Sequence, residues 1–333
     1  MDEVIRLEHG SGGELSRWLV EEVIHPYLRC PASADLPDAA RLELSGPLAL
    51  TTDTYVVDPP FFSGGDIGRL AVFGTCNDLA VSGARARALT LALVLEEGLP
   101  IATLRAVLAS VAAAAVEAAV DVVTGDTKVV PAGRGGGIYV NTAGVGEVVF
   151  EPLARSLARP GDRLIVSGPV GAHGVAVLAA REALEVGAGV RSDCALLWSL
   201  AERLFVLCSG LRFMRDATRG GLAAVSNELC RGMGFGLTVR ESAIPVDPEV
   251  AAVLDLLGLD ALEVANEGVL VAVVAPETAE LAVAALQSHP VGARAAIAGE
   301  VTGEGPGRVT LETRIGGRRL LDFPRGLLLP RIC

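Results

Sequence analysis

The sequence predicts a mixed α/β (α+β) protein of two domains, and three observations lead to this fold class. Its 333 residues exceed one ordinary hydrophobic core, so two domains of roughly 100–200 residues each are expected. Hydrophobic residues make up 51% of the chain and charged residues only 20%, which excludes intrinsic disorder. Apolar runs typical of buried strands alternate with segments of helical periodicity along most of the chain.

In the first half, hydrophobic periodicity predicts an amphipathic helix over residues 14–27, with Leu15, Leu19 and Val23 on its apolar face. A second helix is expected from Ile67, because Asp66 is a suitable N-cap residue. An alanine-rich helix is expected over residues 101–120. The strands predicted for this half are residues 48–50, 89–95 and 122–124, followed by a strand pair at 137–141 and 144–150.

The second half repeats this alternation after a proline- and glycine-containing linker at residues 158–162. Strands are expected at 163–167, 236–239 and 268–275, and helices at 174–185, 220–230, 248–257 and 277–288. The final segment contains two prolines and a glycine, which argue against a regular element and for a mobile tail. The predicted division is therefore 1–155, 156–320 and a tail over 321–333.

Charge restricts the classes of partner. With 28 basic and 40 acidic residues the net charge is −12, which excludes nucleic acid and anionic lipid as general partners. No apolar stretch reaches the ~18 residues of a membrane span, and the N-terminus lacks a signal-peptide pattern. The six cysteines include no Cys-x-x-Cys pair, so the spacing suggests neither a zinc site nor a disulfide framework. A cytoplasmic protein is expected.

Four aspartates lie at predicted element ends or on an apolar helix stripe: Asp53, Asp78, Asp126 and Asp216. Taken singly, each is more often an N-cap or turn residue. Together they predict a magnesium–nucleotide site, because hard cations prefer carboxylate oxygens and an unpaired buried carboxylate costs several kcal/mol.

Lys128 is the only lysine beside 27 arginines. Lysine carries a compact charge that fits against phosphates. In extended backbone Asp126 and Lys128 share one face, so a metal ligand and a phosphate-binding cation would point together. Two alternatives stay open. Asp126 forms a turn at a hairpin edge, or Lys128 is a surface lysine that is present by chance and has no function.

Two glycine-containing segments precede predicted helices, where backbone N–H groups favour anions. One is His9-Gly10-Ser11-Gly12-Gly13, and the other runs from Asp216 through Arg219 to Gly221. Neither is specific alone, and the Walker pattern is absent.

Two further residues are candidates for the chemistry itself. Glu267 precedes a buried strand and is either a general base or an ordinary loop glutamate. Cys333 is the last residue and is either a reactive thiol or an accidental terminal cysteine.

These motifs resemble the HypE family of hydrogenase maturation factors, within the superfamily of aminoimidazole ribonucleotide synthetase, selenophosphate synthetase and thiamine-monophosphate kinase. The resemblance covers nearly the whole chain. The ending Pro330-Arg331-Ile332-Cys333 distinguishes the family, whereas the aspartate motifs define only the superfamily. The matching motifs are His9–Gly13, Thr52-Asp53, Gly64–Gly68, Asn77–Ala84, Thr124–Val130, Arg215–Gly221 and Asn266-Glu267-Gly268.

The resemblance implies a two-domain PurM-like fold whose N-terminal domain dimerises through its sheet, with ATP and Mg²⁺ held between the N- and C-terminal domains. The implied metal ligands are Asp53, Asp78, Asp126 and Asp216. The implied ATP-binding residues are Gly10, Ser11, Gly12, Gly13, Asp53, Asn77, Asp78, Gly125, Asp126, Thr127, Lys128, Asp216 and Arg219.

The implied activity is hydrogenase maturation. In this family the terminal cysteine, here Cys333, receives a carbamoyl group from the carbamoyltransferase HypF. ATP then drives dehydration of the S-carboxamide to a thiocyanate, and the cyano group passes to iron on the HypC–HypD complex for the [NiFe] centre. The residues implied in catalysis are Cys333, Lys128, Asp78 and, as proton acceptor, Glu267.

The same motifs allow two other classes of protein: another enzyme of the superfamily, either a synthetase or a kinase, and a protein that is not an enzyme. A superfamily enzyme of the selenophosphate synthetase kind acts on a free small molecule, but it uses a reactive cysteine near the N-terminus, and none precedes Tyr27. A thiamine-phosphate kinase has no use for Cys333. A nucleotide-binding scaffold that only docks partners is the alternative outside enzymes.

Overall fold

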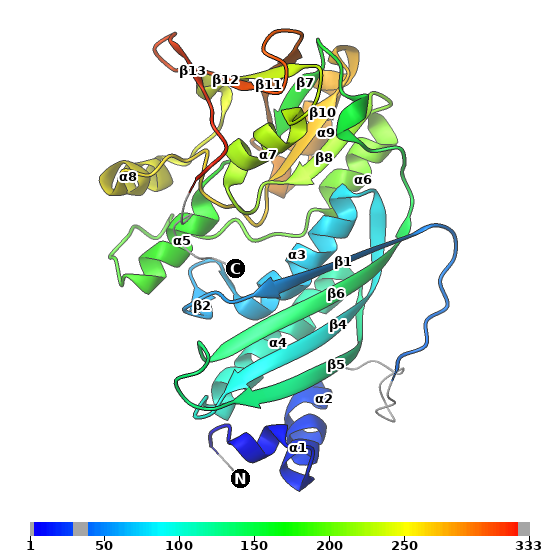
Figure 1. Cartoon of the computed structure of the whole chain (residues 1–333), viewed down its shortest axis with the longest axis vertical. Helices are drawn as coiled ribbons and strands as arrows, with labels where there is room; N and C mark the ends of the chain where they lie inside the picture. Colours follow the sequence, from blue (N-terminus) through cyan, green and yellow to red (C-terminus); the bar gives the residue numbers. More distant parts are fainter. Residues whose placement is uncertain (1–2, 29–38, 326–333) are drawn as a thin grey trace. The chain divides into compact units, whose positions relative to one another are not determined.

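The computed structural model describes residues 3–28 and 39–325, and the chain forms two compact units (Figure 1). The first contains the described residues up to Leu79 together with Ala84–Val148. The second contains Ala80–Gly83 and the described residues from Val149 onward. The boundary between the two units therefore lies after Val148. The sequence predicted it after residue 155.

The first unit contains one four-stranded sheet of order β1-β6-β4-β5. Strand β6 pairs antiparallel with β1 and β4, and β5 pairs parallel with β4 at the edge. Helices α3 and α4 cover one face of this sheet (Figure 1). A short hairpin, β2–β3, precedes α3. The bounds are β1 (Leu48–Tyr55), β2 (Phe61–Phe62), β3 (Gly65–Asp66), α3 (Ile67–Val81), β4 (Ala84–Glu96), α4 (Ile101–Ala118), β5 (Asp121–Val130) and β6 (Ile138–Val148).

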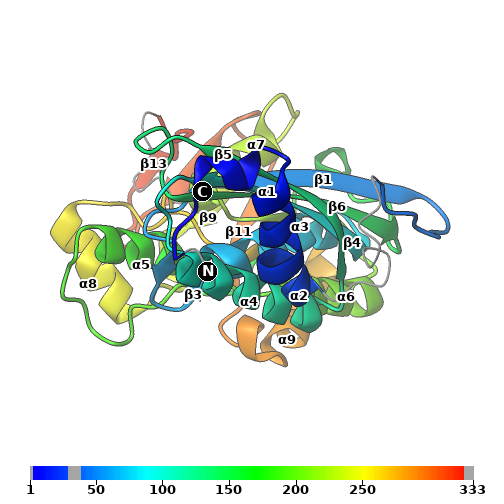
Figure 2. The same cartoon turned by 90° about the horizontal axis from the view of Figure 1, so that it is seen from below.

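The N-terminal helical segment agrees with the prediction for residues 14–27. It consists of α1 (Glu14–Trp18), a wider π-helical turn over Leu19–Ile24, and α2 (His25–Leu28). Leu19 and Val23 are fully buried, which is the apolar face that the periodicity indicated. The segment lies beside β5, as the view from below shows (Figure 2).

Helix α4 is long and apolar enough to cross a membrane, as judged by length and composition, and is the one such helix among the described residues. No apolar stretch of this length was expected from the sequence, in which Arg105 and Glu117 interrupt the apolar run of this helix. Leu104, Leu108 and Val111 are fully buried. The backbone of α4 also approaches α3 so closely that a Cβ on Gly68 would lie 2.5 Å from the Val107 carbonyl oxygen. One face of α4 is therefore part of the core of this unit.

The second unit is built on a seven-stranded sheet of order β13-β12-β9-β11-β7-β10-β8. Its pairs are antiparallel except for the parallel pair β9–β12. The strands are β7 (Arg163–Val166), β8 (Leu211–Asp216), β9 (Gly236–Arg240), β10 (Leu270–Val274), β11 (Ala296–Thr302), β12 (Val309–Glu312) and β13 (Arg318–Leu320). The helices are α5 (Ala172–Arg181), α6 (Trp198–Leu207), α7 (Gly221–Cys230), α8 (Pro248–Leu257) and α9 (Ala279–Gln287).

Both faces of this sheet are covered. Val271 and Val273 of β10 pack into the core on the α7 side, whereas Leu270 and Ala272 pack into the core on the side of α6 and α9. Every residue of β10 is consequently buried, which explains why this strand is a continuous apolar run rather than an alternating one.

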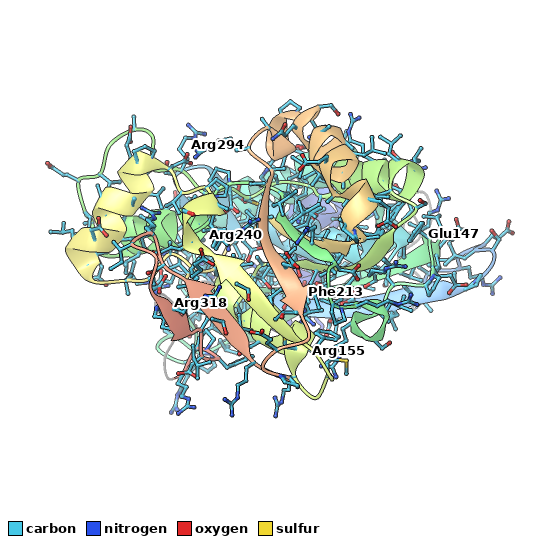
Figure 3. The ribbon with its side chains drawn as sticks, turned by 90° about the horizontal axis from the view of Figure 1, so that it is seen from above. Glu147, Arg155, Phe213, Arg240, Arg294 and Arg318 are labelled. Atoms are coloured by element: carbon cyan, nitrogen blue, oxygen red, sulfur yellow. The ribbon has the colours of Figure 1, made fainter. Side chains whose placement is uncertain are left out.

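The C-terminal end of α7 is capped by an arginine from the segment before β7. Arg155 Nη1 donates to the carbonyl oxygens of Glu228 and Arg231, both at 2.9 Å. Arg155 lies next to Phe213 of β8 (Figure 3). The contact satisfies carbonyl groups that a helix end leaves unpaired.

Several sequence predictions differ from the structure. The expected strand pair at 137–141 and 144–150 is the single strand β6, in which Gly144 marks a close approach: a Cβ there would lie 2.7 Å from Thr75 Cγ2. The helix expected to reach residue 185 ends at Arg181. Leu321, assigned to the mobile tail, is buried and donates its N–H to the Val309 carbonyl. The elements α6, β8, β11, β12 and β13 were not predicted.

We expect Gly125→Ala to destabilise the first unit by about 1–3 kcal/mol. Its Cβ would lie 2.1 Å from the Leu91 carbonyl oxygen, and backbone cannot move aside as a flexible side chain can. Urea unfolding followed by circular dichroism measures the loss. The control is Gly13→Ala, where the nearest atom would be 3.9 Å away; equal losses in both variants would contradict the steric explanation.

Candidate functional site

A cavity of about 350 Å³ lies in the first unit, between the N-terminal segment and β5. One part of its wall is apolar, formed by Val20, Ile24, Leu28, Leu91 and Leu93. The other part is polar and is formed by His9, Gly10, Gly12, Ser16, His25 and the stretch Thr124–Lys128. Pockets of this size, with an apolar wall and a few convergent polar groups, are typical of small-ligand sites.

Close backbone packing shapes the cavity. A Cβ on Gly10 would lie 2.8 Å from the Val129 backbone nitrogen, so the glycine lets the N-terminal segment touch β5. Gly12 donates its N–H to Ser16 Oγ at 2.8 Å, and Ser16 in turn donates to the Glu8 carbonyl. The segment is thus held by its own hydrogen bonds.

Asp126 and Lys128 lie on one face of β5, as the alternation of the strand predicted. Lys128 Nζ donates to Asp126 Oδ1 at 2.7 Å, and the Thr127 N–H donates to the same oxygen at 2.8 Å. The hydrogen bond from Lys128 lowers the pKa of Asp126. Both residues lie within the strand, paired with Ala92 and Val94, so the alternative of a turn at Asp126 is wrong, although β5 is an edge strand.

Asp53, Asn77 and Asp78 lie elsewhere in the first unit. Thr51 of β1 donates its hydroxyl to Asp78 Oδ2 of α3 at 2.8 Å, and Asn77 is buried. Asp53 accepts the Thr54 N–H at 2.8 Å. Since β1 and β5 are opposite edges of a four-stranded sheet, Asp53 and Asp126 are separated by roughly 14 Å. The two carboxylates of one chain therefore cannot hold the same ion.

The remaining predicted residues belong to the second unit. Asp216 is the last residue of β8 and is buried, Arg219 is exposed, and Glu267 is buried just before β10. Asn266 joins these segments. Its Nδ2 donates to the Ala217 carbonyl at 2.8 Å, and its Oδ1 accepts the Gly171 N–H at 2.7 Å.

Asp193, which the sequence analysis did not single out, contacts the backbone of Glu267. Its carboxylate accepts the N–H groups of Glu267 at 3.2 Å and of Gly268 at 3.1 Å. Burial raises the pKa of Asp193 to about 6, although these hydrogen bonds act in the opposite direction.

No three His, Cys, Asp or Glu side chains converge on a metal-sized site within residues 3–28 and 39–325. Ser11 and Gly13 lie next to cavity-lining residues without lining the cavity themselves. Cys333 and most of the expected tail lie outside the described residues.

Two family models match the chain: AIR synthase related protein, N-terminal domain, over residues 37–148, and AIR synthase related protein, C-terminal domain, over residues 159–312. Carbamoyl dehydratase HypE of Rhodobacter capsulatus is 45% identical, covering 100% of this chain and 99% of that protein. Carbamoyl dehydratase HypE of Escherichia coli K12 is also 45% identical, covering 99% of each. The chain belongs to the HypE family.

Solved structures agree with this assignment. A crystal structure of HypE in complex with ATP superposes with a TM-score of 0.94 at 44% identity, covering 98% of this chain and 99% of that chain. A chain of a HypE–HypF complex superposes with a TM-score of 0.80 at 41% identity, covering 92% of this chain and 99% of that chain. The resemblance and the PurM-like fold predicted from the sequence are confirmed.

The apolar wall of the cavity was not predicted from the sequence. Val20, Ile24 and Leu28 recur at intervals of four residues, so they form a stripe beside the one that packs into the core. This second stripe could have predicted the apolar wall, because an amphipathic helix needs only one apolar face to pack against the protein core.

We expect Asp193→Asn to flatten the pH dependence of stability in acid. A carboxyl group whose pKa rises from 3.8 to about 6 on folding stabilises the native state below 3.8, and this contribution is lost as pH rises through about 6. The expected loss in the wild-type chain is about 2 kcal/mol, measured by urea unfolding across that interval. Ser192→Ala, which alters the same loop without removing a carboxyl group, should keep the wild-type slope; a steep slope in Asp193→Asn would contradict the assignment.

Proposed function

We propose that this chain is an ATP-dependent carbamoyl dehydratase that converts an S-carboxamide on its own Cys333 to a thiocyanate, in hydrogenase maturation. The observation that carries the proposal is the cavity beside β5, which combines an apolar wall with the Asp126–Lys128 pair. Family members that match the full length of the chain carry the name carbamoyl dehydratase.

The cavity suits a nucleotide by size and chemistry. Val20, Ile24 and Leu28 offer an apolar surface for the flat base, and the glycine backbone at Gly10 and Gly12 offers room for phosphates. Lys128, the only lysine, would place its ammonium against the phosphates. The HypE structure that contains ATP supports this use of the fold.

The residues also suit magnesium bound together with the nucleotide. Mg²⁺ in nucleotide sites takes one or two carboxylates and fills its other positions with phosphate oxygens and water. Asp126 at the cavity wall meets that need without a cluster of three protein ligands. Asp53, Asp78 and Asp216 remain proposed ligands, but Asp53 would not share the ion that Asp126 of the same chain holds, because the two lie on opposite edges of the sheet.

Dehydration of a carboxamide needs a better leaving group than oxide. With ATP bound, the γ-phosphoryl group passes to the carboxamide oxygen, which then departs as phosphate while the two amide protons are removed and the C≡N bond forms. Lys128 would neutralise charge on the transferred group. Glu267 would accept a proton, and Cys333 would hold the reacting carbon through its sulfur.

The proposed partners follow from the same chemistry. HypF would supply the carbamoyl group, as a solved HypE–HypF complex supports for that protein, and a HypC–HypD complex would accept the cyano group.

We also propose a homodimer through the sheet of the first unit, because Leu48 and Leu50 of β1 are 52% and 79% exposed. A cytoplasmic location is proposed, because the proposed reaction consumes ATP.

Mass spectrometry of the C-terminal peptide tests the function directly. After incubation with HypF, carbamoyl phosphate, ATP and Mg²⁺, we expect a carbamoyl adduct on Cys333 that loses one water equivalent only when ATP is consumed. Cys333→Ser should accumulate no thiocyanate and should still bind ATP. An unmodified Cys333, with ATP consumed on a free small molecule, would instead indicate a small-molecule kinase or synthetase.

Amine-selective acylation tests the nucleotide site without turnover. Because Lys128 is the only lysine, the reagent reports on Lys128 and the N-terminal amine alone. At ATP–Mg²⁺ well above its dissociation constant we expect acylation of Lys128 to slow at least about 10-fold. The N-terminal amine is the internal control. Equal labelling of Lys128 with and without ATP would place the nucleotide elsewhere.

A further inference from the structure

Asp193 holds the backbone of Glu267 and Gly268 through its side chain. Asp193 Oδ2 lies within hydrogen-bond distance of both N–H groups, at 3.2 Å and 3.1 Å, and Oδ1 also accepts the Glu267 N–H at 3.2 Å. The chain backbone adds to this contact, because a Cβ on Gly268 would lie 1.8 Å from the Asp193 carbonyl oxygen. Any residue other than glycine at 268 would push the two segments apart.

The opposite side of Glu267 is held by Asn266. This side chain is fully buried, and its amide bonds to Gly171, Ala217 and Val264. The Ala195 N–H also donates to the Glu267 carbonyl oxygen at 3.4 Å. The backbone of Glu267 is therefore fixed at its N–H by the Asp193 side chain and at its carbonyl oxygen by the Ala195 N–H.

We propose that Asp193 is a positioning residue that fixes the backbone of Glu267 so that the Glu267 carboxylate meets the carboxamide proton. This inference rests on the proposed function, and it adds a residue that the motifs do not include. Asp193 does not touch the reacting atoms; it acts through Glu267.

A carboxylate is a costly group at this position. Burial raises the pKa of Asp193 to about 6, so the ionised form is disfavoured there. Asparagine has nearly the same volume and no charge, but only one of its two terminal atoms accepts hydrogen bonds. Only a carboxylate offers two acceptor atoms, and charged acceptors form the stronger hydrogen bonds. The acidic side chain therefore gives up stability and gains a firmer hold on the backbone of Glu267.

The test compares Asp193→Asn with wild type in the full chain carbamoylated on Cys333. We expect the single-turnover rate of thiocyanate formation to fall about 10- to 100-fold, because small displacements of a catalytic group have effects of this size. The KM for ATP and the rate of carbamoylation by HypF should stay unchanged. Ser192→Ala is the matched control: Ser192 precedes Asp193, and its Oγ bonds His173 of α5 and the Cys194 N–H rather than Glu267. Its rate should equal wild type.

A double-mutant cycle separates positioning from a general structural effect. If Asp193 acts through Glu267, adding Asp193→Asn to Glu267→Gln should cost no further rate. If Asp193→Asn does not fold, Asp193→Glu, which keeps the charge and displaces it by one methylene, is measured with the same expectation.

Three results would overturn the inference: a wild-type rate in the Asp193 variant, a rise in the KM for ATP with kcat unchanged, or additive losses in the cycle. Failure of wild type itself to lose water from the carbamoylated peptide would overturn the proposed function instead, so the two failures are distinguishable.

Discussion

The ordered loops of the second unit depend on one buried amide, that of Asn266. Its side chain is inaccessible to solvent, and its hydrogen bonds connect the turn before α5, the segment between β8 and α7, and its own loop before β10. A buried amide left without partners costs about 1–3 kcal/mol per group, so these three segments have to stay together. This constraint brings Asp216 and Glu267, which are far apart in the sequence, to one end of the sheet.

In the first unit, segments that are distant in the sequence are held together by close backbone contacts rather than by a buried polar side chain. Gly10 against Val129 and Gly125 against Leu91 are approaches that no Cβ tolerates. The contact at Gly10 brings the N-terminal segment onto the edge strand β5, whose outer side would otherwise expose unpaired backbone groups. The contact at Gly125 packs β5 against β4. The cavity is what remains between them, and its polar side is built from the same stretch that carries Asp126 and Lys128. Glycines in this unit are therefore part of the site even where they touch no ligand.

Much of this architecture was visible in the sequence, and the gaps have physical causes. Helix α8 was predicted to the residue, because Pro248 and Gly258 mark its two ends. Strand β6 was predicted as two strands with a break at residues 142–143, whereas it runs without interruption, and the missing side chain of Gly144 allows close packing against Thr75. Periodicity placed Asp126 and Lys128 on one face, but it carries no information on strand order. The separation of Asp53 from Asp126 depends on that order, and the role of Asp193 depends on a tertiary contact with residues some 75 positions away.

The attachment of the C-terminal segment bounds what a reactive group at Cys333 can do. Leu321 is buried, its N–H donates to Val309, and its carbonyl accepts the Asn227 side chain of α7 at 3.0 Å. Twelve residues follow it in the sequence, and they span at most about 40 Å when fully extended. Under the proposed function, every group that Cys333 reaches, in its own chain or in a partner, would therefore lie within that distance of a fixed point on the second unit.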